Sequence, residues 1–178
     1  MAGAGTTPSA PREAPPQLRV PRPPESEPAD EMTMARGWLT HLRESAIFKL
    51  EDLDAARLRW RPTPTANSLG AIVVHLGYAE RLWIRVFFAG ESMDMTWREH
   101  MFDLPGGWSV VDVVGFYRAE TRATDAVLDA APSFDLEAAT TARPTTLRWV
   151  VTHVLEETAR HVGHMDITRE LLDGRTGR

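Results

Sequence analysis

The sequence predicts an all-α fold, a four-helix bundle with a long crossover between its second and third helices. Four stretches carry apolar residues at steps of three and four, the spacing that gathers side chains on one face of a helix. Prolines and glycines lie between these stretches, where they favour turns. The connection at residues 91–108 is much longer than packed helices usually need. One long link of this kind is typical of a bundle with a crossover, and the connections do not support a sheet.

The chain before the first helix has a different composition. Residues 1–30 hold eight of the thirteen prolines, and Ala, Gly, Ser and Glu make up most of the remainder. Such a segment cannot bury enough apolar surface to offset the entropy cost of ordering it. We therefore expect a mostly disordered tail at residues 1–30 and one bundle domain at residues 31–176.

The first helix is expected from Glu31 to about Ala56. Apolar side chains recur through this stretch with helical spacing, until the prolines of residues 61–64 break the pattern. The apolar positions are Trp38, Leu39, Leu42, Ala46, Leu50 and Leu53.

The second helix is expected to begin at Asn67 or Ser68 and to run to Ala89. Either side chain can accept a hydrogen bond from a free N–H group of the first turn. Gly90 suits the position after the last helical residue, where the backbone turns left-handed. His75 lies in the middle of the apolar face of this helix. An imidazole there needs a polar partner, either a backbone carbonyl in the core or a ligand.

The crossover and the third helix follow. Residues 91–108 contain many apolar side chains for a connection, so they are expected to pack, either as local core or over the mouth of a pocket. Ser109 followed by Asp112 resembles a capping box and predicts the start of a helix that ends near Ala131. Residues 132–144 then form a polar connector that contains two prolines.

The last helix carries the groups best suited to chemistry. Thr145 or Thr146 can cap it, and Gly174 ends it. On a helical wheel, four polar groups fall within about 80° of one another along the border of the apolar face. These groups are His153, Glu157, His161 and His164. One interpretation is a partly solvated edge that pairs with arginines of a neighbouring helix. The other is a metal site, because a carboxylate and an imidazole four residues apart can close on one ion.

Composition excludes several classes of function. The chain has 178 residues, 43% of them hydrophobic, which is enough for one soluble domain with a core. Its net charge is −5 and it has no basic run, so neither a nucleic-acid surface nor a surface for anionic membranes is expected. Cysteine is absent, which excludes disulfides, thiolate ligands and a cysteine nucleophile. With no apolar run of membrane-spanning length and no signal peptide, we expect a cytoplasmic protein.

Taken together, these stretches resemble the DinB-like superfamily, and in particular its actinobacterial branch related to mycothiol-dependent transferases. The resemblance covers roughly residues 31–176. It depends on two sets of residues, of which the set on the last helix is the more specific. The first set is Asn67-Ser68-Leu69, His75-Leu76, Glu80-Arg81-Leu82-Trp83 and Ala89-Gly90-Glu91. The second is Leu147-Arg148-Trp149, His153, Glu156-Glu157, Ala159-Arg160-His161, Gly163-His164, Asp166, Arg169-Glu170 and Asp173-Gly174.

The resemblance implies a metal held by one histidine of the second helix and two residues four apart on the last. Carried over by position, the ligands are His75, Glu157 and His161. Many members of the superfamily have three histidines, so Glu157 departs from the commoner set. Glutamate does occur there in the branch that resembles mycothiol-dependent maleylpyruvate isomerase. The implied ion is Zn²⁺ first, with Ni²⁺, Mn²⁺ or Fe²⁺ as alternatives, because a carboxylate makes the site harder.

The leading functional hypothesis is a metal-dependent S-transferase or thiol-dependent isomerase. The ion would bind and deprotonate a low-molecular-weight thiol, which the resemblance suggests is mycothiol, for attack on a small electrophile. His164 and His153 are the candidates for proton transfer or for orienting the ligands, and His153 is also an alternative ligand. Two alternatives are a metal-dependent small-molecule hydrolase and a non-catalytic metal- or ligand-binding stress protein. The apolar residues of the long connection and the bundle topology favour a homodimer.

Overall fold

The structure is a computed structural model that describes residues 22–23, 29–64, 67–140 and 144–176. Across these residues it contains helices, turns and loops, with one isolated β-bridge and no strand. Most of the tail predicted at residues 1–30 lies outside the described residues. No helix among the described residues is both long enough and apolar enough to cross a membrane.

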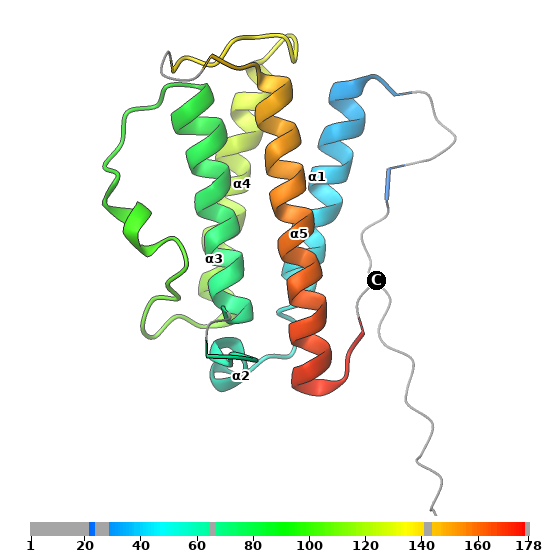
Figure 1. The fold of residues 1–178 in the computed structure, drawn as a ribbon, viewed down its shortest axis with the longest axis vertical. Helices are drawn as coiled ribbons and strands as arrows, with labels where there is room; N and C mark the ends of the chain where they lie inside the picture. Colours follow the sequence, from blue (N-terminus) through cyan, green and yellow to red (C-terminus); the bar gives the residue numbers. More distant parts are fainter. Residues whose placement is uncertain (1–21, 24–28, 65–66, 141–143, 177–178) are drawn as a thin grey trace, which may run out of the picture.

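Four long helical segments form the bundle, as predicted (Figure 1). Contacts connect α1 with α5, α5 with α3, and α3 with α4, while ion pairs connect α4 back to α1. The crossover between α3 and α4 lies along the outer side of α3 in Figure 1. The segments are α1 (Glu31–Phe48), α3 (Leu69–Glu80) continued by the π-helix η1 (Arg81–Phe88), α4 (Val110–Ala130) and α5 (Leu147–Asp173).

The first helix is shorter than predicted. α1 ends at Phe48, and a separate short helix, α2 (Ala55–Arg59), follows, so the expected continuous helix to about Ala56 was wrong. The buried guanidinium of Arg169 in α5 donates to the carbonyls of Lys49 at 2.6 Å and Glu51 at 2.9 Å. These carbonyls lie just beyond the end of α1, where the chain leaves the helix and needs partners for its backbone. A contact with a residue far along the sequence therefore accompanies the end of this helix.

The second helix has the predicted limits but not the predicted second half. Ser68 caps α3 by accepting a hydrogen bond from the Ala71 N–H, and Gly90 has a φ of +71° just after η1. Within η1, hydrogen bonds span five residues instead of four, so the side chains turn to different faces. As a result Ile84 and Phe88 enter the core. Leu82, Trp83 and Val86, which a regular helix would place on the apolar face around His75, are only partly buried.

The third and fourth helices follow their sequence signals. The Ser109 side chain accepts from the Asp112 N–H, and the Asp112 carboxylate accepts from the Ser109 N–H, which confirms the capping box. α5 begins after Thr146, as predicted, but the Thr146 side chain makes no capping hydrogen bond; the helix ends at Gly174, which has a φ of +79°. This helix of 27 residues spans the whole bundle and carries the polar stripe.

The crossover packs against the bundle, as its apolar content predicted. It contains a short 3₁₀ helix, η2 (Thr96–His100). The Trp97 ring stacks on Tyr78 of α3 at 5.1 Å between centroids. The Arg59 guanidinium of α2 donates to the carbonyls of Leu104, Pro105 and Trp108, which ties the end of the crossover to the bottom of the bundle.

Candidate functional site

Three side chains from α3 and α5 meet between these helices. His75 projects from the middle of α3, while Glu157 and His161 lie one turn apart on α5. Each residue offers one possible ligand atom, and these three atoms all lie within 4.8 Å of one another. The Glu157 Oε1 atom is 3.0 Å from His75 Nε2 and 3.3 Å from His161 Nε2. Two segments about 80 residues apart in the sequence thus converge on one carboxylate oxygen.

The packing of α3 holds His75 at this place. Its side chain is buried with only 5% exposure, within a helix whose neighbouring residues nearly all belong to the core. On the far side of α3, Gly77 lets α4 approach, since a Cβ there would lie 2.7 Å from a ring atom of Phe116. α4 and α5 therefore both pack against α3, and the imidazole is directed to α5.

The partner of His75 is a carboxylate and not a backbone carbonyl. Its Nε2 donates to Glu157, while the Nδ1 atoms of both His75 and His161 are buried without a hydrogen-bond partner among the described residues. A histidine kept only for core packing would be expected to satisfy its ring nitrogens with backbone groups. The observed rings instead direct a nitrogen to one acidic group. This arrangement favours the ligand-site interpretation over that of a satisfied core histidine.

Burial and mutual contacts set the charge of the three groups. Burial lowers the pKa of His75, and the hydrogen bond with Glu157 only partly opposes this. Burial also lowers the pKa of His161, and the nearby His75 adds to that shift. Burial acts to raise the pKa of Glu157, but its contacts with the two histidines outweigh this and leave the pKa below its ordinary value. Near neutral pH the group therefore consists of two neutral imidazoles and one carboxylate, the protonation states that metal ligands require.

The spacing of the three groups also fits a metal ion. Around a tetrahedral Zn²⁺ with ligands at about 2.0–2.1 Å, neighbouring ligand atoms are roughly 3.3 Å apart. The observed separations of 3.0 and 3.3 Å between Glu157 and the two histidines are close to this value, and the ligand atoms of the two histidines lie within 4.8 Å of each other. Two histidines and a glutamate also form one of the donor sets found in catalytic zinc sites. The residues present therefore fit the ion that the resemblance implied.

An aromatic ring from the crossover covers one side of this group. Phe102 stacks on His75 with 3.8 Å between ring centroids and an angle of 12° between ring planes. The same ring lies 6.1 Å from His161. In the sequence, Phe102 was one of several apolar residues of the long connection, which was expected to pack as local core or over the mouth of a pocket. It forms a hydrophobic wall beside the polar atoms.

The two remaining histidines of the stripe lie on either side of the group. The exposed His164 ring lies 5.4 Å from that of His161. His153 lies one turn before Glu157 and contacts two tryptophans, Trp83 at 4.3 Å and Trp149 at 5.2 Å between centroids. Neither histidine belongs to the group of three. Their catalytic roles, and the role of His153 as an alternative ligand, stay predictions.

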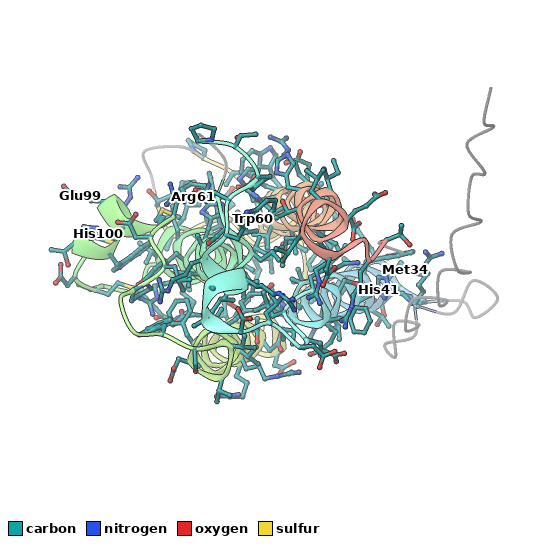
Figure 2. All side chains as sticks on the ribbon, turned by 90° about the horizontal axis from the view of Figure 1, so that it is seen from below. Met34, His41, Trp60, Arg61, Glu99 and His100 are labelled. Atoms are coloured by element: carbon teal, nitrogen blue, oxygen red, sulfur yellow. The ribbon has the colours of Figure 1, made fainter. Side chains whose placement is uncertain are left out.

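The other two histidines lie elsewhere. Figure 2, which views the bundle from below, shows His100 on the outer side of the crossover and His41 at the opposite side of the bundle. His100 pairs with Asp103, and His41 lies edge-on to Trp38.

The sequence of this chain matches one family model over residues 34–174, a range that includes His75, Glu157 and His161. That model is the mycothiol-S-transferase family. The chain belongs to this family. The match confirms the resemblance to the mycothiol-related DinB-like proteins. Membership in the mycothiol-S-transferase family implies a transferase, with a small thiol as a substrate.

A solved structure supports the fold. The structure described as "the conserved protein of locus from Enterococcus faecalis" superposes with a TM-score of 0.62 at 17% sequence identity. The superposition covers 83% of this mycothiol-S-transferase family member and 99% of the other chain. At this identity the likeness shows the shared helical fold alone. A search of curated proteins finds no match.

Proposed function

We propose that this chain is a metal-dependent S-transferase that joins the sulfur of mycothiol to a small electrophile, with His75, Glu157 and His161 holding Zn²⁺. The observation that carries the proposal is the convergence of these three groups from α3 and α5. Family membership supports the thiol, because the family is named for mycothiol. The absence of cysteine fits a reaction in which a cosubstrate supplies the sulfur.

The donor set supports a catalytic role over a purely structural one. Structural zinc sites are usually closed by four protein ligands, whereas catalytic sites use three and leave a position for substrate. The group of described residues here has three members. When bound, the ion would supply positive charge that lowers the pKa of a coordinated thiol.

Residues of this chain would bind the ion, exclude water and transfer protons. Glu157 would bring one negative charge to the ion, and Phe102 would exclude water from the side of His75 on which it stacks. His164 is exposed beside His161, so it is the group we propose to accept the thiol proton. His153, one turn away in the other direction, would orient the electrophile or pass a proton to it.

The transfer of the thiol to the electrophile requires neither an oxidant nor a reductant. The thiol loses its proton to His164, the sulfur electron pair forms a bond to the electrophilic carbon, and a leaving group departs with the electron pair of its own bond. In an isomerisation the thiol would add, the adduct would rearrange, and the thiol would leave again.

The experiment that tests this proposal measures metal content and turnover together. Protein purified without a metal-affinity tag is expected to hold about one equivalent of zinc by elemental analysis. It should convert mycothiol and 1-chloro-2,4-dinitrobenzene to the thioether. His161→Ala should lose both the zinc and the turnover, because one of three protein ligands is gone. The matched control is His100→Ala, which removes an exposed histidine outside the site and should retain both.

Two results would count against the proposal. A wild-type protein without metal, as stable as the metal-treated protein, would indicate a bundle that needs no ion. Metal-dependent turnover of an ester or amide in the absence of any thiol would show a hydrolase that uses the same three residues.

A further inference from the structure

A row of aromatic rings lies next to the three candidate ligands and is not used by them. Trp83 of η1 contacts both Trp149 and His153 of α5, at 5.6 and 4.3 Å between ring centroids. Trp149 and His153 stack on each other at 5.2 Å, with 14° between their planes. We call Trp83, Trp149 and His153 the aromatic platform. Phe87 supports it from the side, with its ring 5.3 Å from that of Trp83.

The platform lies along the same edge of α5 as the candidate ligands. His153 precedes Glu157 by one turn and Trp149 precedes it by two, so the platform begins about 6 Å along the helix axis from the carboxylate. The rings of His75, His161 and Phe102 contact one another on the other side of Glu157. A molecule bound at the platform would therefore lie next to a thiol held at the three ligands.

Trp83 belongs to a π-helical segment that follows α3. It lies on the side of this segment that faces α5, the side to which His75 is also directed. The hydrogen bonds of η1 span five residues, and Ile84 and Phe88 lie in the core. Trp83 is partly exposed at the border with α5. π-helical turns are often found at functional sites.

Exposure and charge indicate what the platform can bind. Trp149 is 44% exposed, so part of its ring is free to contact a ligand. Both arginines that flank the platform on α5 already have acidic partners. Arg148 pairs with Glu31 and Asp135, and Arg160 pairs with Glu156. With these cations occupied, stacking and burial of apolar surface would dominate binding, which favours a neutral, flat ligand over an anionic one.

We propose that the aromatic platform binds the electrophile and selects neutral compounds whose reacting carbon belongs to or adjoins an aromatic ring. This inference rests on the proposed function, since it places the electrophile beside a thiol held at His75, Glu157 and His161. For an aryl halide the step forms a carbon–sulfur bond and breaks the carbon–halogen bond. The halide leaves with the bonding electrons, and the thiol proton goes to the solvent through His164.

The first test measures selectivity in the metal-loaded protein. Trp149→Ala is expected to raise KM for 1-chloro-2,4-dinitrobenzene roughly tenfold, because a stacking partner is lost. KM for mycothiol and for diethyl maleate, a neutral electrophile without an aromatic ring, should change less than about twofold on the same argument. Trp149→Phe keeps a flat ring and should restore most of the loss. The matched control is Trp38→Ala, which removes another exposed tryptophan, on α1 beside His41, and should change none of these constants.

The second test measures binding without chemistry. 1,3-Dinitrobenzene has no leaving group, so its affinity can be measured by calorimetry for both the metal-loaded protein and His161→Ala. Both proteins should bind it with similar affinity, and adding Trp149→Ala should weaken binding roughly tenfold in each.

These tests separate the two proposals. If His161→Ala lacks turnover but keeps binding that depends on Trp149, both stand. If the wild type binds the dinitrobenzene through Trp149 but holds no metal and transfers no thiol, the platform stands and the proposed function fails. Equal losses for the aromatic and aliphatic electrophiles, a rise in KM for mycothiol alone, or binding unaffected by Trp149→Ala would overturn the platform.

Discussion

At the residue scale, the central feature is a histidine in an apolar environment whose ring nitrogen points to a carboxylate. Burial of an imidazole without compensation is costly, and His75 receives compensation from only one atom of Glu157 at Nε2. His161 shares the same oxygen from the other side. Both histidines are held in the neutral form by burial, so the folded metal-free protein resists protonation at these positions.

This resistance predicts a pH-dependent stability of the metal-free protein. Because the pKa of His75 and of His161 is lowered on folding from an ordinary value of 6.5, the unfolded chain binds more protons below that pH. The stability that the neutral rings contribute is complete above pH 6.5 and is lost as the pH falls through and below it. Glu157 adds a separate loss at lower pH, below the ordinary carboxyl value of 4.5, since its pKa is lowered on folding.

The measurement is the free energy of unfolding by urea between pH 7.5 and pH 5, in the presence of a chelator. It should fall with decreasing pH, and His161→Gln should make the fall less steep by removing one titrating group. His100→Gln, at an exposed position, is the control for general effects of removing a histidine. An identical slope for the wild type and His161→Gln would contradict this interpretation.

At the scale of single elements, α1 and η1 show how distant contacts alter a helix that has a clear local pattern. The guanidinium of Arg169 donates hydrogen bonds to the carbonyls of Lys49 and Glu51, where the chain leaves α1. Asp54 then starts α2 by accepting a hydrogen bond from the Arg57 N–H. In η1 the hydrogen bonds span five residues, and Ile84 and Phe88 lie in the core. Each element thus keeps its helical character while its end or its register depends on a neighbour.

Arg169→Met should show how much the hydrogen bonds from Arg169 to the end of α1 contribute to the free energy of unfolding. Removing hydrogen bonds from a buried charged donor to backbone carbonyls is expected to lower the free energy of unfolding by about 2–3 kcal/mol. The control is Arg118→Met, which breaks an exposed pair with Glu44 and should cost less than about 1 kcal/mol. Urea denaturation followed by circular dichroism measures both values. Equal losses for the two variants would show that the Arg169 contacts have no special role in ending α1.

At the scale of the whole molecule, a buried ion pair joins the helices that surround the core. Arg43 of α1 donates two hydrogen bonds to Glu80 of α3, at 2.8 and 2.6 Å, and a third to Asp125 of α4. Glu80 is 1% exposed. The pair lies between two clusters of buried apolar side chains, one toward each end of the bundle. It therefore connects three of the four helices where their apolar contacts are interrupted.

Glu80→Leu is expected to lower the free energy of unfolding by about 3–5 kcal/mol, because it leaves the buried charge of Arg43 without its main partner. The double variant Arg43→Leu/Glu80→Leu should recover much of this loss, since an apolar pair avoids the desolvation of two charges. Thermal and urea unfolding of the two single variants and the double variant form a complete cycle. A double variant less stable than either single variant would show that the pair is needed for the packing of the bundle.

The sequence by itself determined the helical segments and the residues whose side chains can bind a metal or transfer a proton. Local rules identify features that depend on residues only a few positions apart. These features are the four-helix pattern, the caps at Ser68 and Ser109, and the glycines at the ends of the second and last helices. The four-residue step from Glu157 to His161 is also local. The position of His75 on an apolar face indicated that it needed a partner, and the family resemblance indicated which one.

Only the tertiary structure decided how these elements meet. Three contacts of this kind join residues that are far apart in the chain. Phe102 stacks on His75, Arg169 contacts the chain at the end of α1, and Trp83 lies beside His153. Such contacts depend on the path of the crossover and on the relative rotation of packed helices. Helical periodicity specifies which face of a helix is buried, but not which neighbour covers it, because many partners could bury the same apolar area.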